Sequence, residues 1–329
     1  RVRRGKDGYL DVFEPEAQRL AIDIPAERWI TVRAPEGNAD ATSALRDAFA
    51  RARATQTGND YVGIRLEAGR TYVVASTQIG GTVLPINETQ RVVFDGNGAT
   101  LRVASPELTR KEVDLFSIGR SRNVVLADFV VEAASVPFTT GEILDVSPRG
   151  ENTQTVTFRV DEGELDPLKD ISRDGRNNAY AYDAHIPGRL ALGSWTHYPG
   201  SGNPSIQATD TPGVFTHRVT RTNDSIGPGG KWLIKNKRGG VVYLTTRAGA
   251  ENITLSGVDG RASGGGHLRF WQTSGVNILN CRFEPEDDNW ISSSADGVLG
   301  RGREGVWSED TLIRGVCEDI MNTYGQNMI

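Results

Sequence analysis

The chain has 329 residues, a net charge of −5 and 37% hydrophobic residues, with 38 glycines and only 2 methionines. That length suits one elongated β domain or two domains, and the composition favours strands and turns over helices. Because the sequence shows neither a Lys/Arg block interleaved with aromatics nor an apolar run of membrane-spanning length, we expect no nucleic acid and no membrane as partners.

The first predicted element is an amphipathic helix over residues 38–54 (NADATSALRDAFARARA). Asp40 or Thr42 can accept hydrogen bonds from the free N–H groups of its first turn. Its small-residue face consists of Ala41, Leu45, Ala48 and Ala52.

A buried strand, Val62–Leu66, is predicted next, followed by a turn and the segment Thr71-Tyr-Val-Val74. A helix followed by this "I-x-L-x-x-G-x-T-Y" pattern resembles the N-terminal cap of the pectin-lyase-like β-helix superfamily. Such a helix covers the open end of the first coil of a solenoid and hides an unpaired strand edge.

Five later segments share a short apolar pattern that is clearest as "N-V/I-x-L/I". Its valine or isoleucine lies at positions 92, 124, 253, 276 and 306, and apart from one long gap the intervals are 32, 23 and 30 residues. One solenoid coil of three short strands needs this length, whereas a β-sandwich would not repeat the pattern at coil-like spacing. The sequence therefore predicts an all-β fold, a right-handed parallel β-helix (solenoid) with an N-terminal capping helix.

The long gap, residues 140–245, does not show the repeated pattern. It contains other segments, such as Thr155-Val-Thr-Phe-Arg-Val160 and Lys231-Trp-Leu-Ile-Lys235. We interpret it as an inserted β-rich, barrel-like subdomain, with several irregular coils and long loops as the alternative. The predicted organisation is thus residues 1–139 for the cap and first coils, 140–245 for the insertion, and 246–329 for further coils.

The last three coils align when Leu268, Val298 and Met321 are stacked inside the solenoid. Side chains alternate along a strand, so their neighbours should point outward. The candidate substrate-binding residues at these outward positions are His267, Arg269, Trp271, Arg301, Asn322 and Tyr324. For His267, a surface or core position is the competing interpretation, and Trp271 could serve ordinary packing.

The turns before these strands carry three carboxylates, namely Asp296, Glu318 and Asp319. Stacked coils lie about 4.8 Å apart, so these groups should be neighbours. Three carboxylates at that range cannot all ionise freely, and at least one pKa should rise. A proton-holding acid beside an ionised base is what cleavage of a glycosidic bond requires. Each motif alone is an ordinary turn, and only their spacing of one coil favours an active site.

Ser294-Ala-Asp-Gly-Val298, followed by Glu318-Asp319, resembles the "N-T-D-G … D-D" pattern of polygalacturonases. It resembles more closely the α-1,3-galactosidase family of β-helix glycosidases, with its "D-G-x-H … x-D-D-x-x-N-x-H-G" pattern and its inserted β-barrel. The resemblance implies an inverting glycoside hydrolase in which Glu318 is the general acid, while Asp296 and Asp319 activate water. It also implies a poly- or oligosaccharide substrate and a secreted or periplasmic location.

Three departures from the family pattern are visible. Glu318 replaces an aspartate, and Leu299 and Tyr324 replace the family histidines, so the sugar specificity is open. The chain also lacks an initiator methionine and a signal peptide, which suggests a processed or trimmed chain. It ends at Ile329, before any downstream His or Arg-Lys motif, so we expect the β-helix to continue further.

A cofactor is not expected, although the acidic residues Glu284, Glu286, Asp287 and Asp288 could bind calcium instead of forming a solvated loop. Cys281 and Cys317 match no metal spacing and are expected to be buried free thiols.

Two further functions compete with the hydrolase. A polysaccharide lyase would need an arginine or lysine base, for which Arg269 and Arg301 are the nearby candidates. A non-catalytic carbohydrate-binding β-helix, of the adhesin or tailspike type, would keep binding sugar without the three carboxylates. The fold alone cannot choose among them.

Overall fold

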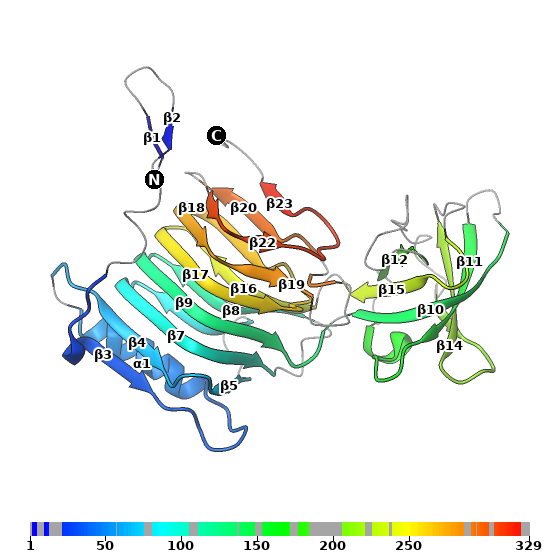
Figure 1. Cartoon of the computed structure of the whole chain (residues 1–329), viewed down its shortest axis with the longest axis horizontal. Coiled ribbons are helices and arrows are strands. Elements are labelled where there is room, and N and C mark those ends of the chain that lie inside the picture. Colours follow the sequence, from blue (N-terminus) through cyan, green and yellow to red (C-terminus); the bar gives the residue numbers. More distant parts are fainter. Residues whose placement is uncertain are drawn as a thin grey trace.

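The computed structural model describes residues 2–4, 10–12, 22–56, 58–75, 81–104, 111–136, 138–148, 153–171, 177–183, 206–220, 226–236, 239–285, 291–293, 295–302 and 306–323. Across these residues the protein is mostly β. A large, strongly curled, all-parallel sheet lies beside a six-stranded antiparallel sheet (Figure 1). A small antiparallel pair, β1 (Val2–Arg4) and β2 (Leu10–Val12), precedes both. Among the described helices, none has the length and apolar character needed to cross a bilayer.

The parallel sheet has 15 strands. Before the antiparallel sheet these are β3 (Trp29–Val32), β4 (Val62–Leu66), β5 (Thr71–Val74), β6 (Thr82–Asn87), β7 (Gln90–Val103), β8 (Glu112–Gly119) and β9 (Arg122–Ala133). After it come β16 (Gly240–Thr246), β17 (Glu251–Arg261), β18 (Leu268–Leu279), β19 (Arg282–Glu284), β20 (Val298–Gly302), β21 (Val306–Glu309), β22 (Leu312–Ile313) and β23 (Met321–Thr323).

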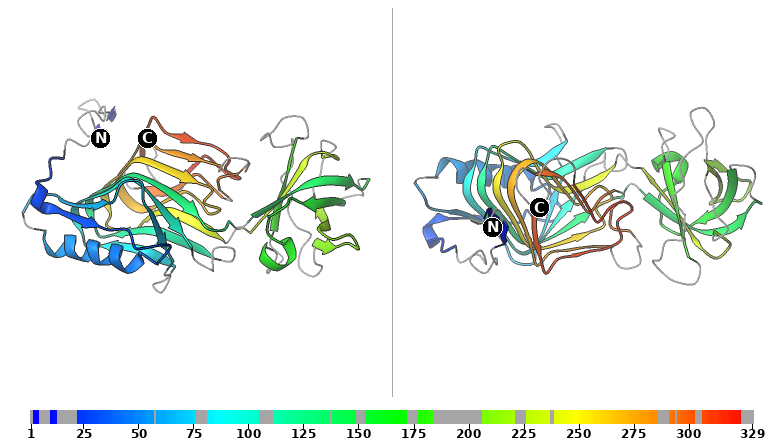
Figure 2. Two further views of the ribbon diagram at one scale, coloured as in Figure 1. Left: turned by 60° about the horizontal axis from the view of Figure 1, so that its bottom comes forward. Right: turned by 90° about the horizontal axis from the view of Figure 1, so that it is seen from above.

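These strands form three parallel ladders that the chain visits in a fixed order. The first ladder joins β6, β8, β16, β18, β20 and β23. The second joins β3, β4, β7, β9, β17, β18 and β21. The third joins β5, β7, β9, β17, β19 and β22. One visit to each ladder makes a layer, and the stacked layers curl around a common interior (Figure 2).

The register confirms the predicted repeat. The five positions 92, 124, 253, 276 and 306 are successive partners on the second ladder. Leu268, Val298 and Met321 are successive partners on the first ladder. Residues that are far apart in the sequence therefore stack directly, as the spacing predicted.

The corner before the second ladder explains the asparagine of the repeated pattern. Asn123 and Asn252 have φ of 56° and 52°, and Gly275 occupies the same place one layer later with φ of 69°. Asparagine and glycine tolerate this left-handed conformation better than other residues. The Asn252 Nδ2 also donates a 2.6 Å hydrogen bond to the Asn123 Oδ1, which ties one layer to the next.

Replacing Asn252 with alanine should lower the free energy of unfolding by about 2 kcal/mol, because alanine is strained at positive φ and cannot make the side-chain bond. Asn252→Gly is the matched control. It relieves the strain, removes only the bond, and should cost about 1 kcal/mol. Urea unfolding of both variants checks this, and equal losses would contradict the conformational part of the explanation.

One helix, α1 (Thr42–Ala54), covers the end of the parallel sheet at β3, β4 and β6. Asp40 accepts from the Thr42 backbone N–H at 2.8 Å, as expected for the start of the helix. The predicted face of Ala41, Leu45, Ala48 and Ala52 is fully buried, and Phe49 extends it. The helix therefore begins at Thr42, four residues later than the predicted range, and packs its predicted face against this end of the sheet.

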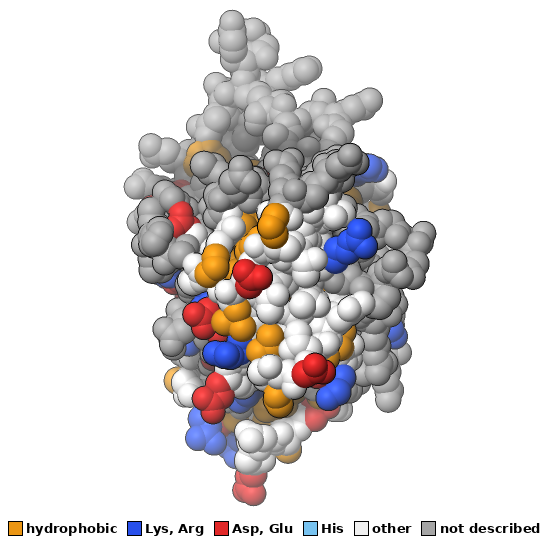
Figure 3. Space-filling model, turned by 90° about the vertical axis from the view of Figure 1, so that its right-hand side faces the viewer, with side chains coloured by type: hydrophobic (Ala, Val, Ile, Leu, Met, Phe, Trp, Pro, Cys, Tyr) orange, Lys and Arg blue, Asp and Glu red, His pale blue; other side chains and the backbone are white. Residues whose placement is uncertain are grey.

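The antiparallel sheet occupies most of the long gap, in agreement with the predicted β-rich segment. Its strands are β10 (Phe138–Val146), β11 (Thr153–Val160), β12 (Asn177–Tyr182), β13 (Ile206–Ala208), β14 (Val214–Thr220) and β15 (Lys231–Asn236), in the order β12-β15-β10-β11-β14-β13. A short π-helix, η3 (Pro167–Ile171), accompanies them. On the face shown in Figure 3, the described hydrophobic side chains are scattered among acidic and basic ones.

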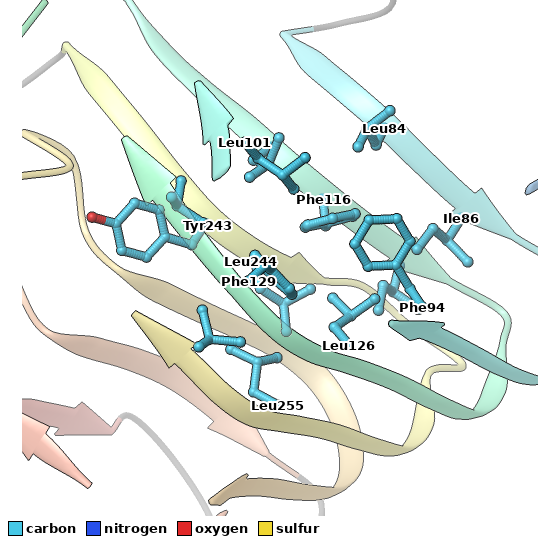
Figure 4. Packing of buried hydrophobic residues seen from close by; sticks show 14 of the residues in the cluster. Leu84, Ile86, Phe94, Leu101, Phe116, Leu126, Phe129, Tyr243, Leu244 and Leu255 are labelled. Atoms are coloured by element: carbon cyan, nitrogen blue, oxygen red, sulfur yellow. The ribbon is translucent and has the colours of Figure 1, made fainter. Parts of the chain in front are cut away.

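Aromatic rings fill the interior of the parallel sheet beneath α1. The Phe94 ring stacks on Phe49 at a centroid distance of 5.6 Å and meets Phe116 and Phe129 edge-on at 5.5 and 5.7 Å. These rings come from the helix and from all three ladders, and Figure 4 shows three of them converging with the surrounding leucines. The core thereby joins adjacent layers to each other and to the helix.

Candidate active site

The candidate site lies at the corner where the chain passes from the third ladder to the first. The backbone ladder continues into this corner: the His267 N–H donates to the Asp296 carbonyl at 3.3 Å, and the Gly297 N–H donates to the Asp319 carbonyl at 2.9 Å. Asp296 therefore sits directly between the layers of His267 and Asp319. A Cβ on Gly297 would lie 2.6 Å from the Ile320 carbonyl oxygen, which explains why glycine follows Asp296.

Asp296 is the most buried of the three predicted carboxylates, with 5% of its surface exposed. Its Oδ1 accepts from the Asp319 backbone N–H at 3.1 Å, and its side chain also bonds to Asn322. Burial, followed by the negative charges of Glu318 and Asp319, raises its pKa, although the two hydrogen bonds oppose the rise. The structure thus brings the three carboxylates together and agrees with the expectation that one pKa rises.

The other two carboxylates have different surroundings. Asp319 is exposed. Glu318 is 18% exposed at its side chain, and its Oε1 lies 3.7 Å from the Nζ of Lys235, a fully buried residue of β15 in the antiparallel sheet. Lys235 was not predicted from the sequence, because it lies far from the carboxylates in the chain.

Arg269 points outward from the first ladder, as predicted. Its guanidinium pairs with both carboxylate oxygens of Glu112 on β8, one of them at 2.7 Å. Burial alone would lower the pKa of Arg269, but the bond to Glu112 and the charges of Glu112, Asp114 and Asp296 together raise it. Arg269 therefore stays positively charged beside Asp296.

More polar side chains, which were not predicted from the sequence, continue this outward face. Asp114 accepts from the Thr245 hydroxyl at 2.7 Å and pairs with Arg247 at 3.2 Å. Burial raises the pKa of Asp114 despite these partners. In the sequence, the available signal is that Asp114 is a charged residue between the apolar residues Val113 and Leu115 of β8.

His267 does not point outward, which corrects the prediction from strand alternation. Its ring is fully buried and stacks between Tyr243 and Phe283, each at a centroid distance of 5.2 Å. Its nitrogens bond to the hydroxyls of Ser263 and Ser292 at 3.2 and 2.9 Å. Burial lowers its pKa to about 3, so the ring is neutral. The strand begins only at Leu268, and the alternation does not extend into the corner.

Three further predicted binding residues, Trp271, Arg301 and Asn322, lie on the outer side of the first ladder. Trp271 is half-buried and is the direct partner of exposed Arg301 on the next strand. Asn322 is half-buried beside Asp296. Tyr324 lies outside the described residues.

The predicted calcium loop is only partly described. Glu284 forms ion pairs with Arg282 and Arg314, at 2.9 and 2.8 Å, so protein cations already balance its charge. The other three acidic residues of that loop lie outside the described residues, and within the described ranges no group of three or more His, Cys, Asp or Glu side chains could hold a metal ion. Both cysteines are free thiols; Cys281 is buried as predicted, whereas Cys317 is only half-buried.

The sequence matches no protein-family model and no curated protein sequence. A solved structure from Parabacteroides merdae, described as a "putative glycosyl hydrolase", aligns with a TM-score of 0.41 and 10% identity over 90% of this chain and 95% of that one. The AlgE4 A-module, a mannuronan C-5 epimerase from Azotobacter vinelandii, aligns with a TM-score of 0.14 and 9% identity over 88% of this chain and 97% of that one. Similarity this low assigns neither a fold nor an activity to the chain.

Proposed function

We propose that the curled parallel sheet is a right-handed parallel β-helix, interrupted by a barrel-like subdomain whose strands span residues 138–236, and that the protein is a glycoside hydrolase. The observation that carries the function is the gathering of Asp296, Glu318 and Asp319 at one corner, in adjacent layers of the first ladder. Glycosidic bond cleavage needs a protonated carboxyl group and an ionised one within one site.

Electrostatics favour Asp296 as the holder of the proton. Its pKa is raised by burial and by the neighbouring negative charges, whereas Lys235 balances the charge of Glu318. This reverses the roles that the family resemblance implies, in which Glu318 donates the proton. Asp296 then protonates the departing oxygen, and exposed Asp319, with Glu318 beside it, takes a proton from the attacking water. Direct attack by water inverts the anomeric carbon.

The outer side of the first ladder offers groups that suit a poly- or oligosaccharide, including an α-galactoside. Trp271 supplies a flat apolar surface for a sugar ring, and the guanidinium of its partner Arg301 supplies N–H donors to sugar hydroxyl oxygens. Asn322 and Arg269 lie next to Asp296 and can orient the sugar that is cleaved.

The lyase alternative is weaker at Arg269. A lyase base must lose a proton, and Glu112 with its neighbours raises the pKa of this arginine above an already high value. Arg301 is the other candidate, and it is exposed beside Trp271.

A screen of oligo- and polysaccharides, α-galactosides included, separates the three functions. A hydrolase releases reducing ends without absorbance near 235 nm, a lyase produces that absorbance, and a binding module does neither while still retaining sugar. The matched control for each carboxylate variant is Asp310→Asn, because Asp310 is exposed at another corner with φ of 48°, which asparagine tolerates. Release that persists after all three carboxylates become amides would overturn the proposal.

A further inference from the structure

The antiparallel sheet begins and ends at the corner that carries the carboxylates. The chain leaves the third ladder after β9 and re-enters the first ladder at β16, and Asp296 and Asp319 occupy the same corner in later layers. β16 and β23 are three strand spacings apart on the first ladder, or about 14 Å. To reach Glu318, the antiparallel sheet must extend along this row of corners.

An apolar cluster forms the contact between the two sheets. Phe138, Tyr180, Tyr182 and Leu233 from the antiparallel sheet pack with Ile291, and Cys317 packs at the edge of the same cluster. Alternation along β15 places Trp232 and Ile234 in the separate core of the antiparallel sheet. Leu233 and Lys235 therefore face the parallel sheet together.

Lys235 is the charged residue of this contact that reaches the candidate site. Its side chain is fully buried, its Nζ lies 4.9 Å from the Tyr180 ring centroid, and it approaches Glu318 at 3.7 Å. A buried ammonium must be balanced by an opposite charge, and so must a largely buried carboxylate. The separation exceeds ordinary hydrogen-bond length, so Lys235 acts on Glu318 as a point charge.

We propose that Lys235 is a positioning residue of the carboxylate site: the antiparallel sheet supplies it to hold Glu318, charged and in place, beside Asp296. This inference rests on the proposed function. The antiparallel sheet then contributes a side chain, Lys235, to the carboxylate site.

Cys317 reports on this ion pair without any need for a substrate. Burial raises the pKa of its thiol to about 11, while the charge of Lys235 lowers that pKa and the charge of Glu318 raises it. The cluster also holds the hydroxyls of Tyr180 and Tyr182, and burial raises the pKa of Tyr182. Fully buried Cys281 serves as an internal control in the same protein.

The first test measures iodoacetamide alkylation of Cys317 and Cys281 by peptide mass spectrometry at pH 8.5. Lys235→Met should slow alkylation of Cys317 about 3- to 10-fold, and Glu318→Gln should accelerate it by a similar factor. Lys235→Arg should stay near wild type. The matched control is Lys231→Met, because Lys231 lies on the same face of β15 and pairs with Asp161 instead.

Two outcomes would overturn the assignment. Equal rates in Lys235→Met and wild type would show that the lysine charge does not act at Glu318 and Cys317. Faster alkylation in both Lys235→Met and Lys235→Arg would show that the side chain only packs the contact between the sheets.

The second test uses a substrate identified by the screen. Lys235→Met should lower kcat at least 10-fold with little change in KM and should shift the pH profile of kcat, whereas Lys235→Arg should recover part of the rate. Lys231→Met should match wild type. If Lys235→Met matches wild type as well, the positioning role fails while the hydrolase stands. If the Cys317 alkylation rates change in the variants as expected but no glycan is cleaved, the proposed hydrolase function is wrong. The positioning role, which rests on that function, is then wrong as well.

Discussion

Asp296→Asn is expected to lower the rate of glycan hydrolysis by about 10²- to 10⁴-fold, the usual contribution of one general acid–base group. The substituted side chain keeps an oxygen that can accept from the Asp319 N–H, and its amide can turn to bond Asn322. It cannot donate a proton to a leaving group. The activity loss should therefore come without a loss of structure.

The free energy of unfolding separates this explanation from a structural one. Because the pKa of Asp296 is raised in the folded protein, the unfolded chain releases this proton at a lower pH than the folded protein does, so wild type loses stability as the pH rises from the ordinary carboxyl pKa to the raised one. Asp296→Asn should thus be as stable as wild type below the ordinary carboxyl pKa. Its relative stability should grow as the pH rises from that value to the raised pKa. Urea unfolding at several pH values, with Asp310→Asn as control, measures this difference. A variant that is less stable at every pH would mark Asp296 as a structural residue.

The strands of the parallel sheet could be predicted because each layer needs the same two features, an apolar side chain that faces the interior and a residue that tolerates the left-handed corner before it. Val124 and Ile253 must face the interior after an Asn that takes the left-handed corner, so both the apolar residue and the Asn recur at the length of a layer. The carboxylates followed from the same regularity, because Asp296 and Asp319 lie one layer apart.

Alternation failed where the strand pattern stops. The expected outward position of His267 assumed that the strand begins before Leu268. In the corner, side-chain direction depends on local turns and on partners such as Ser292, whose hydroxyl accepts or donates at 2.9 Å to the ring. A buried neutral histidine between two aromatic rings leaves no periodic signal in the sequence.

Lys235 could not be predicted for a different reason. Its place near Glu318 depends on how the antiparallel sheet packs against the parallel sheet, and no repeat relates these two parts of the chain. The alternation of Lys231, Leu233 and Lys235 in β15 indicates a shared face, but it does not reveal what that face contacts. Long-range contacts between unlike sheets require the structure.

Phe94→Ala is expected to lower the free energy of unfolding by about 4–5 kcal/mol, near the upper end for a buried aromatic residue. Phe94 is fully buried and contacts Phe49, Phe116 and Phe129, so its removal leaves a cavity and ends three ring contacts. Phe94→Leu fills most of the space and should cost about half as much. Ile320→Ala is the surface control, because that side chain is 58% exposed and should cost less than about 0.5 kcal/mol.

The elements that lose stability in Phe94→Ala show whether each layer is stabilised mainly by the layers next to it. In a solenoid each layer contacts only adjacent ones, so a cavity at Phe94 should weaken α1 and β4 first and leave β20 nearly unaffected. Hydrogen exchange in Phe94→Ala should therefore accelerate in α1 and β4 well before it does in β20. Equal acceleration throughout would mean that all layers unfold as one cooperative unit. The candidate site near β20 would then depend on the packing beneath α1, and Phe94→Ala would reduce hydrolysis in proportion to the unfolded fraction.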